Sequence, residues 1–93
     1  MPKVILKGYI LVPDIDLIAV REELPNHIRL TLQEEGCLLF QVLQDENNAS
    51  CFNVYEEFSD SHSFEAHQER VKKSRWGEVT CNVERRYQID GSD

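Results

Sequence analysis

Residues 37–58 read CLLFQVLQDENNASCFNVYEEF, and this stretch decides the fold. Both of its ends are rich in β-branched, aromatic and other apolar residues, which favours strands over residues 37–44 and 51–58. Residues 45–48 between them are Asp, Glu, Asn and Asn. Asp and Asn are typical of turns because their side chains bond the nearby backbone. The stretch therefore predicts a β-hairpin.

A strand and then a helix are predicted before the hairpin. Residues 3–12, KVILKGYILV, form a strand-like run that stops at a Pro-Asp pair. The segment that begins at Asp14 or Asp16 and ends at Gly36 repeats apolar residues at spacings of three and four, which indicates a helix. Its apolar stripe comprises Leu17, Val20, Leu24, Ile28 and Leu32. Pro25 is expected to kink this helix or to divide it into two.

A helix and then a strand are predicted after the hairpin. Ser59, Asp60 and Ser61 offer N-caps for a helix that ends around Trp76 and Gly77. Its inward stripe has helical spacing and comprises Phe64, His67 and Val71. Strict alternation of apolar and polar residues over 79–89 predicts the last strand.

The order βαββαβ is the ferredoxin-like plan, an α+β fold in which an antiparallel sheet carries both helices on one face. A chain of 93 residues has the length of one domain, so we expect residues 1–93 to form a single domain with a core over about residues 3–89. The first two strands carry apolar residues on both faces, namely Ile5, Leu6, Ile10, Leu11, Leu38, Leu39, Phe40 and Leu43. A face without helices should turn polar unless a partner covers it. The sequence therefore predicts a homodimer, a dimeric α+β barrel.

Composition excludes several classes of function. Ten Lys and Arg stand against 17 Asp and Glu, for a net charge of -7, which argues against a nucleic-acid partner. No apolar run approaches the roughly 20 residues that span a bilayer, and a signal-peptide pattern is absent, so we expect no membrane partner and a cytoplasmic location. Phosphate-binding glycine loops, GxSxG and HExxH motifs are missing from the sequence.

The three cysteines follow no pattern of a disulfide framework or a zinc site. Cys37, Cys51 and Cys81 are odd in number and far apart, and there is no CxxC pair. We expect reduced thiols that pack as small apolar residues, and no metal site.

His67 and Glu56 are the candidate chemical residues. His67 shares its stripe with apolar residues, so its imidazole should face the sheet. Glu56 interrupts an apolar strand face formed by Phe52, Val54 and Phe58. A carboxylate on such a face needs a partner, and the imidazole above it is the obvious one. The pair is either a structural hydrogen bond between helix and sheet or an acid and base in a pocket. A metal site is the third alternative, but two ligands without a third bind a metal ion weakly.

Gly8 leaves a gap in the side-chain layer of the first strand, which indicates either a bulge or space for a ligand. Four aromatic residues could line such a space or belong to the core: Phe40, Phe58, Trp76 and Tyr87. The two other histidines, His27 and His62, are expected at the surface because they fall off the apolar stripes.

Several of these segments resemble one family. They are the run Glu34 to Leu38 (EEGCL), Phe40 after it, the run Tyr55 to Asp60 (YEEFSD), and His67 twelve residues after Tyr55. In order and spacing they resemble the antibiotic biosynthesis monooxygenases. That resemblance implies dimeric ferredoxin-like barrels that oxygenate a phenol or quinol with molecular oxygen and no cofactor. It carries over Glu56, Phe58 and His67, with His67 as base and Glu56 orienting it.

One departure keeps other functions open. Many members carry a second histidine five residues beyond the first, where this chain has Lys72. One alternative is a non-catalytic module that binds a small metabolite. Residues 34–36 (EEG) and 43–45 (LQD) also resemble segments of the autoinducer-2 phospho-sugar isomerases. That resemblance implies a second alternative, an isomerase of small phosphorylated carbonyl compounds. In that function, basic residues would clamp the phosphate, and the candidates are Arg70, Lys72, Lys73 and Arg75.

Overall fold

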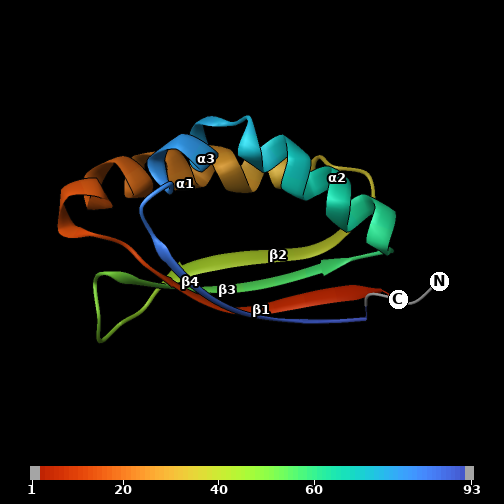
Figure 1. Ribbon diagram of the computed structural model, residues 1–93, viewed down its shortest axis with the longest axis horizontal. Helices are drawn as coiled ribbons and strands as arrows, with labels where there is room; N and C mark the ends of the chain where they lie inside the picture. Colours follow the sequence, from red (N-terminus) through yellow and green to blue (C-terminus); the bar gives the residue numbers. More distant parts are fainter. Residues whose placement is uncertain (1–2, 92–93) are drawn as a thin grey trace.

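The computed structural model describes residues 3–91 and has helices on one face of a four-stranded antiparallel sheet (Figure 1). The elements are β1 (Val4–Leu11), a 3-10 turn η1 (Asp14–Asp16), α1 (Leu17–Leu32), β2 (Cys37–Gln44), β3 (Cys51–Phe58), α2 (Ser61–Lys72), α3 (Arg75–Val79) and β4 (Glu84–Asp90). The strand order is β2-β3-β1-β4. The predicted ferredoxin-like fold is confirmed.

The core lies between the helices and the sheet. Alternate residues of β1 and β3 point into it, because neighbouring side chains of a strand face opposite ways. The pairing of Leu6 with Glu56 and of Gly8 with Val54 places all four on the helix side. The buried apolar cluster is Leu6, Ile10, Val12, Val20, Phe40, Val42, Phe52, Val54, Trp76, Val79 and Val83.

Pro25 does not divide the first helix into two, which was one of the two outcomes predicted for it. α1 runs from Leu17 to Leu32 with Pro25 inside it, and Pro25 is exposed. A proline in a helix removes one backbone hydrogen bond. Here that loss falls on the solvent side, and the buried side of α1 packs on β2 and α3.

The last strand begins later than predicted. Residues 75–79 form the short helix α3, and β4 begins only at Glu84. Ser74 caps α3 by accepting a hydrogen bond from the Gly77 amide, at 3.2 Å. The sequence was ambiguous here, because Trp76, Val79 and Val83 have helical spacing while Val79 and Val83 also fit a strand.

Gly8 marks a close approach of two strands, with no break in register. The register through Gly8 is continuous with both β3 and β4. Its φ is 153°, and a Cβ atom there would lie 1.9 Å from the carbonyl oxygen of Arg86. The bulge prediction for Gly8 is therefore wrong. The irregularity lies instead in β2 between Cys37 and Leu39, beside Leu38.

The sheet face away from the helices carries exposed apolar residues. Leu39 pairs with Glu57, which places it on this face, and Leu43 pairs with Asn53. Leu43 is 64% exposed, and Tyr9 and Leu39 are each 38% exposed. We call the outward-facing residues Ile5, Tyr9, Leu11, Leu39, Leu43 and Tyr55 the open sheet face.

Two further expectations concern the cysteines and the membrane. The cysteines are free, and Cys81 is exposed, so it does not pack as predicted. Within residues 3–91, none of the helices is long and apolar enough to cross a membrane.

Candidate functional site

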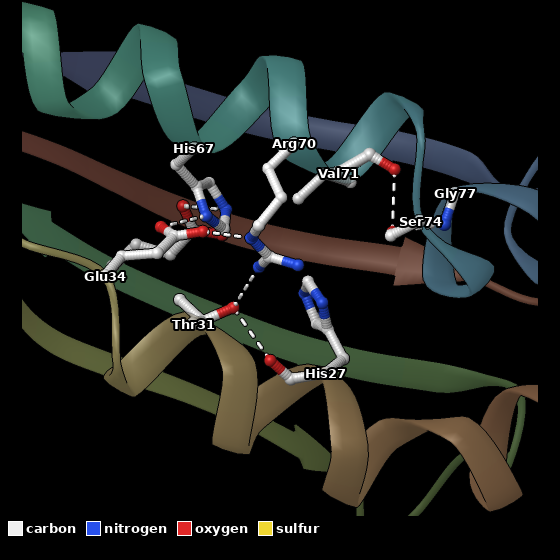
Figure 2. A network of polar contacts seen from close by, with 9 residues as sticks. His27, Thr31, Glu34, His67, Arg70, Val71, Ser74 and Gly77 are labelled. Carbon is white, nitrogen blue, oxygen red and sulfur yellow. Dashed lines mark hydrogen bonds and ion pairs between the residues drawn. The ribbon is translucent and has the colours of Figure 1, made fainter.

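The site begins at His67, the one buried residue of α2. Its Nδ1 lies 2.8 Å from Oε1 of Glu34 (Figure 2). Glu34 stands in the turn that follows α1, where its amide donates to the carbonyl of Thr31 and its own carbonyl accepts from the amide of Cys37. The turn thus fixes the carboxylate under α2.

Arg70 ties the same carboxylate to α1. One helical turn after His67, its Nε donates to the second oxygen of Glu34, and its Nη2 donates to Thr31 Oγ1 at 3.0 Å (Figure 2). The Thr31 hydroxyl in turn donates to the carbonyl of His27, at 2.8 Å. One chain of hydrogen bonds therefore joins α1 to α2, and it runs from the backbone carbonyl of His27 to the imidazole of His67.

These contacts determine which nitrogen of His67 carries the proton. Glu34 accepts a hydrogen bond from the guanidinium of Arg70, and the oxygens of a carboxylate can only accept. The Nδ1 of His67 must therefore donate, and in a neutral ring Nε2 is then left with a free lone pair. Burial lowers the pKa of His67, although the charge and hydrogen bond of Glu34 act the other way and Arg70 adds to the lowering. Neutral His67 can therefore accept a proton at Nε2.

Glu56 does not form the predicted hydrogen bond. Its Oε1 lies 3.9 Å from His67 Nε2, which is too long for one, and this oxygen has no other partner. Burial, and then the charge of Glu34, raise its pKa to about 8. At neutral pH Glu56 is therefore a protonated acid beside the free nitrogen of His67, and the residue that orients His67 is Glu34.

Aromatic rings surround this pair on the sheet side. The centre of the Phe58 ring lies 4.9 Å from that of His67, and the Phe40 ring lies 5.8 Å away. Phe40 and Phe58, two of the four predicted aromatic residues, are both buried. Trp76, the third, is stacked on His27 at 4.5 Å with 3° between the planes.

His27 is buried, and its predicted place at the surface is wrong. It is only 3% exposed, and it shares an inward stripe of α1 with Val20 and Thr31. The predicted stripe followed the apolar residues and therefore ended on Leu32, which is 57% exposed. Polar residues face inward here because they bond or stack with α2 and α3. His62 is exposed, as expected.

Gly8 and Tyr87 lie at the β4 side of the sheet. Tyr87 pairs with Gly8, so its ring is on the helix side of an edge strand, where it is partly exposed. Burial of the phenol end, followed by the charge of Glu56, raises the pKa of Tyr87. A Cβ atom on Gly8 would meet the backbone of β4, so this position cannot carry a side chain.

A cavity of about 520 Å³ lies beside His67. Of the residues predicted for an oxygenase site, only His67 lines it. The lining is Glu34, Glu35, Gly36, Ser59, Asp60, His62, Ser63, Ala66, His67 and Arg70. Within residues 3–91, no three His, Cys, Asp or Glu side chains are arranged to hold a metal ion.

Sequence reasoning missed three residues of this cluster, His27, Thr31 and Glu34, and it named Arg70 only as a candidate for binding a phosphate. Glu34 carried a signal, since it stands in the EEGCL run, but nothing local indicated its partner 33 positions away. His27 and Thr31 lie four apart and could have been found as a polar helical stripe.

Glu34→Gln and Arg70→Gln are expected to move the pKa of His67 in opposite directions. Glu34 raises that pKa and Arg70 lowers it, so Glu34→Gln should lower it further and Arg70→Gln should raise it. Titration of the imidazole nitrogens by NMR measures both shifts. Shifts of the same sign in the two folded variants would show that His67 is not held in this network.

Comparison with known proteins places the chain in a family. The family model for antibiotic biosynthesis monooxygenase matches residues 6–76. A search among curated proteins finds no match. Among solved structures, the "Putative antibiotic biosynthesis monooxygenase" of Nitrosomonas europaea has a TM-score of 0.77 at 20% identity, covering 98% of this chain and 89% of that one.

Two other structures share the fold at similarly low identity. A protein of the same designation from Deinococcus radiodurans has a TM-score of 0.74 at 20% identity, with 97% and 92% of the two chains covered. A conserved protein of Bacteroides thetaiotaomicron named "Possible Oxidoreductase" has a TM-score of 0.77 at 16% identity, with 97% of each chain covered. The match of the family model over most of the sequence shows that this chain belongs to the antibiotic biosynthesis monooxygenase family.

Proposed function

We propose that the protein oxygenates a quinol or polyphenol-type aromatic compound with molecular oxygen and without a cofactor. The observation that carries this proposal is the neutral imidazole of His67, which Glu34 holds at Nδ1 and which directs Nε2 toward an apolar, aromatic layer. A base in such a place can take the proton of a phenol, because a general base must be unprotonated at the working pH.

The proposed reaction balances without an outside reductant. His67 Nε2 takes the phenolic proton, and the electron-rich phenolate passes one electron to oxygen. The two radicals join at a ring carbon, and the proton on His67 returns to the resulting peroxide. Loss of water then leaves a quinone. One oxygen atom enters the ring and the other leaves as water, and the substrate supplies all four electrons.

Glu56 and the aromatic layer support the same chemistry. Protonated Glu56 can donate a hydrogen bond to an oxygen of the substrate, which a carboxylate could not do. Phe40 and Phe58 place apolar rings against the His67 imidazole and so limit access of water to it. A water-poor site strengthens each polar contact and limits side reactions of the radical pair.

The isomerase alternative gains no support from the basic residues. Arg70 is engaged by Glu34 and Thr31. Lys72 pairs with Glu69 and Arg75 pairs with Glu78, both on exposed surface. Each of these three cations is thus already paired with a carboxylate of this chain. A module that binds the same class of ligand without turnover remains the second candidate, because it would use the same aromatic layer.

We also propose that the protein is a homodimer joined through the open sheet face. Leu43 is 64% exposed there, and an apolar patch of this kind is typical of an interface. Two sheets that pack face to face would cover it in both protomers.

Leu43→Asp is expected to convert the dimer to a monomer, because it would bury an unpaired charge against the partner's sheet. Sedimentation measures the mass. Ile18→Asp is the matched control, since Ile18 is 75% exposed but lies on α1, on the opposite side of the sheet. A dimer that survives Leu43→Asp contradicts this interface.

Oxygen uptake tests the proposed reaction. Metal-stripped protein is given a panel of dihydroxynaphthalenes and anthrols, alongside a blank without protein because quinols autoxidise. We expect uptake above the blank with one oxygen molecule consumed per quinone formed. Saturable binding of the same compounds without uptake would replace the oxygenase by the binding module.

A further inference from the structure

The cavity beside His67 leads inward from the surface. Glu35 and His62, which line it, are exposed, whereas His67 is only 3% exposed. Its volume of about 520 Å³ lies in the range of small-molecule sites. Because this space holds no protein atoms, a ligand can occupy it and touch His67 while Arg70 keeps its own contacts. The cavity is therefore room for a ligand that the proposed reaction has not yet used.

The wall of the cavity is polar and has more acidic than basic side chains. Of the lining side chains that the structure describes, only Ala66 is apolar. Three carboxylates stand against one guanidinium, and Glu34 is paired with Arg70. The charges of Glu35 and Asp60 are thus unmatched by an arginine or a lysine of the wall.

Glu35 is the less compensated of these two carboxylates. Asp60 caps α2, and its Oδ1 accepts a hydrogen bond from the Ser63 amide at 2.8 Å. The bonds from Ser63, and then the charge of His62, lower the pKa of Asp60, which is therefore ionised at neutral pH. The N-terminus of α2 offsets part of its charge. Glu35 is exposed and, among residues 3–91, takes part in no ion pair.

We infer that this cavity binds a substituent of the substrate that carries a protonated amine, and that it rejects carboxylate, sulfonate and phosphate groups. This inference rests on the proposed reaction at His67 and adds the charge class of the substrate. An amine in the cavity is attracted by Glu35 and Asp60. An anion would lie beside the same two carboxylates, and the one guanidinium of the wall is already paired.

Binding without oxygen tests the inference separately from turnover. The probes are naphthols that differ in a single substituent on the ring without the hydroxyl: an aminomethyl, a hydroxymethyl or a carboxylate group. For the unmodified protein we expect the amine to bind most tightly and the carboxylate most weakly, with roughly tenfold between their dissociation constants. The difference should shrink as salt is added, because salt screens exposed charges.

Glu35→Lys is expected to reverse this order of affinity, and Glu35→Gln to weaken it. Glu46→Lys is the matched control, since it changes the net charge by the same amount. Glu46 is exposed in the turn between β2 and β3, whereas the cavity lies where β2 begins and β3 ends (Figure 1). An eight-residue strand such as β2 is roughly 25 Å long, well beyond the screening length at physiological salt. Glu46→Lys should therefore keep the order.

Nitrogen NMR locates the bound amine without any variant. His62 and His67 line the cavity, and His27 does not. The amine probe should therefore shift the signals of His62 and His67 and leave that of His27 in place. A probe bound elsewhere would leave His62 unshifted.

The inference is overturned if the amine probe does not bind, if the probes bind equally, if Glu35→Lys keeps the original order, or if His62 stays unshifted. Each of these results can occur while oxygen uptake remains dependent on His67. Conversely, the expected order can hold in a protein that consumes no oxygen, so failure of the oxygenase and failure of the amine site are distinguishable.

Discussion

His67→Gln is expected to lower kcat for oxygen consumption by roughly 10²- to 10⁴-fold, the usual contribution of a positioned general base. Gln can keep a hydrogen bond to Glu34, but its amide has no basic lone pair to take a phenolic proton. The measurement is initial oxygen uptake with the best substrate of the panel, corrected for autoxidation.

The pH profile separates loss of the base from loss of structure. In the unmodified protein the rate should fall on the acid side with a pKa below 6.5, where His67 becomes protonated. His67→Gln should lack this limb. Glu69→Gln, an exposed change on the same helix, should keep both rate and profile. A folded His67→Gln variant with undiminished rate would remove His67 from the mechanism.

Glu56→Gln is expected to stabilise the protein, by an amount that grows with pH. Burial raises the pKa of Glu56 from 4.5 to about 8, so the folded state binds a proton that the unfolded state has lost. The contribution of Glu56 to the free energy of unfolding is therefore most favourable below pH 4.5, becomes less favourable as the pH rises toward about 8, and is constant above it. The full shift corresponds to roughly 3–5 kcal/mol of the free energy of unfolding.

Urea unfolding at a series of pH values measures this effect. Gln is neutral throughout, so the two proteins should be similar at pH 4 and should diverge up to about pH 8. Glu57→Gln is the matched control, because Glu57 faces the opposite side of the sheet. Bonds from Tyr55 and then Lys3 lower the pKa of Glu57, so its stabilising effect is present at high pH and lost in acid. If the free energies of unfolding of the unmodified protein and of Glu56→Gln changed in parallel with pH, Glu56 would be ionised in the folded state.

The pattern of apolar residues predicted most of the fold because it is a local signal. The hairpin over residues 37–58 and the two long helices follow from spacing and turn chemistry alone. The start of β4 could not be predicted in this way, because Trp76, Val79 and Val83 have helical spacing while Val79 and Val83 also fit a strand. The cap at Ser74 decides between them.

The site was harder to predict because its contacts are not local. His67 and Glu56 could be identified as polar residues on apolar faces, and both are buried. The predicted hydrogen bond between them is absent although the two side chains face each other at 3.9 Å, since an alternation pattern gives the face of a residue but not its distance to another element. Glu34 reaches His67 only because the turn after α1 lies beneath α2 (Figure 2). His27 was misplaced because the apolar stripe of α1 was taken as the buried one.

The central claim is that His67 is a neutral base with its proton on Nδ1 and Nε2 free. Nitrogen NMR of protein labelled at histidine measures this directly, and the chain has only three histidines to resolve. At pH 7 we expect a neutral His67 whose Nδ1 carries the proton, and loss of that preference in Glu34→Ala. A charged ring, or a proton on Nε2, would contradict the claim, because Nε2 could then accept nothing from a substrate.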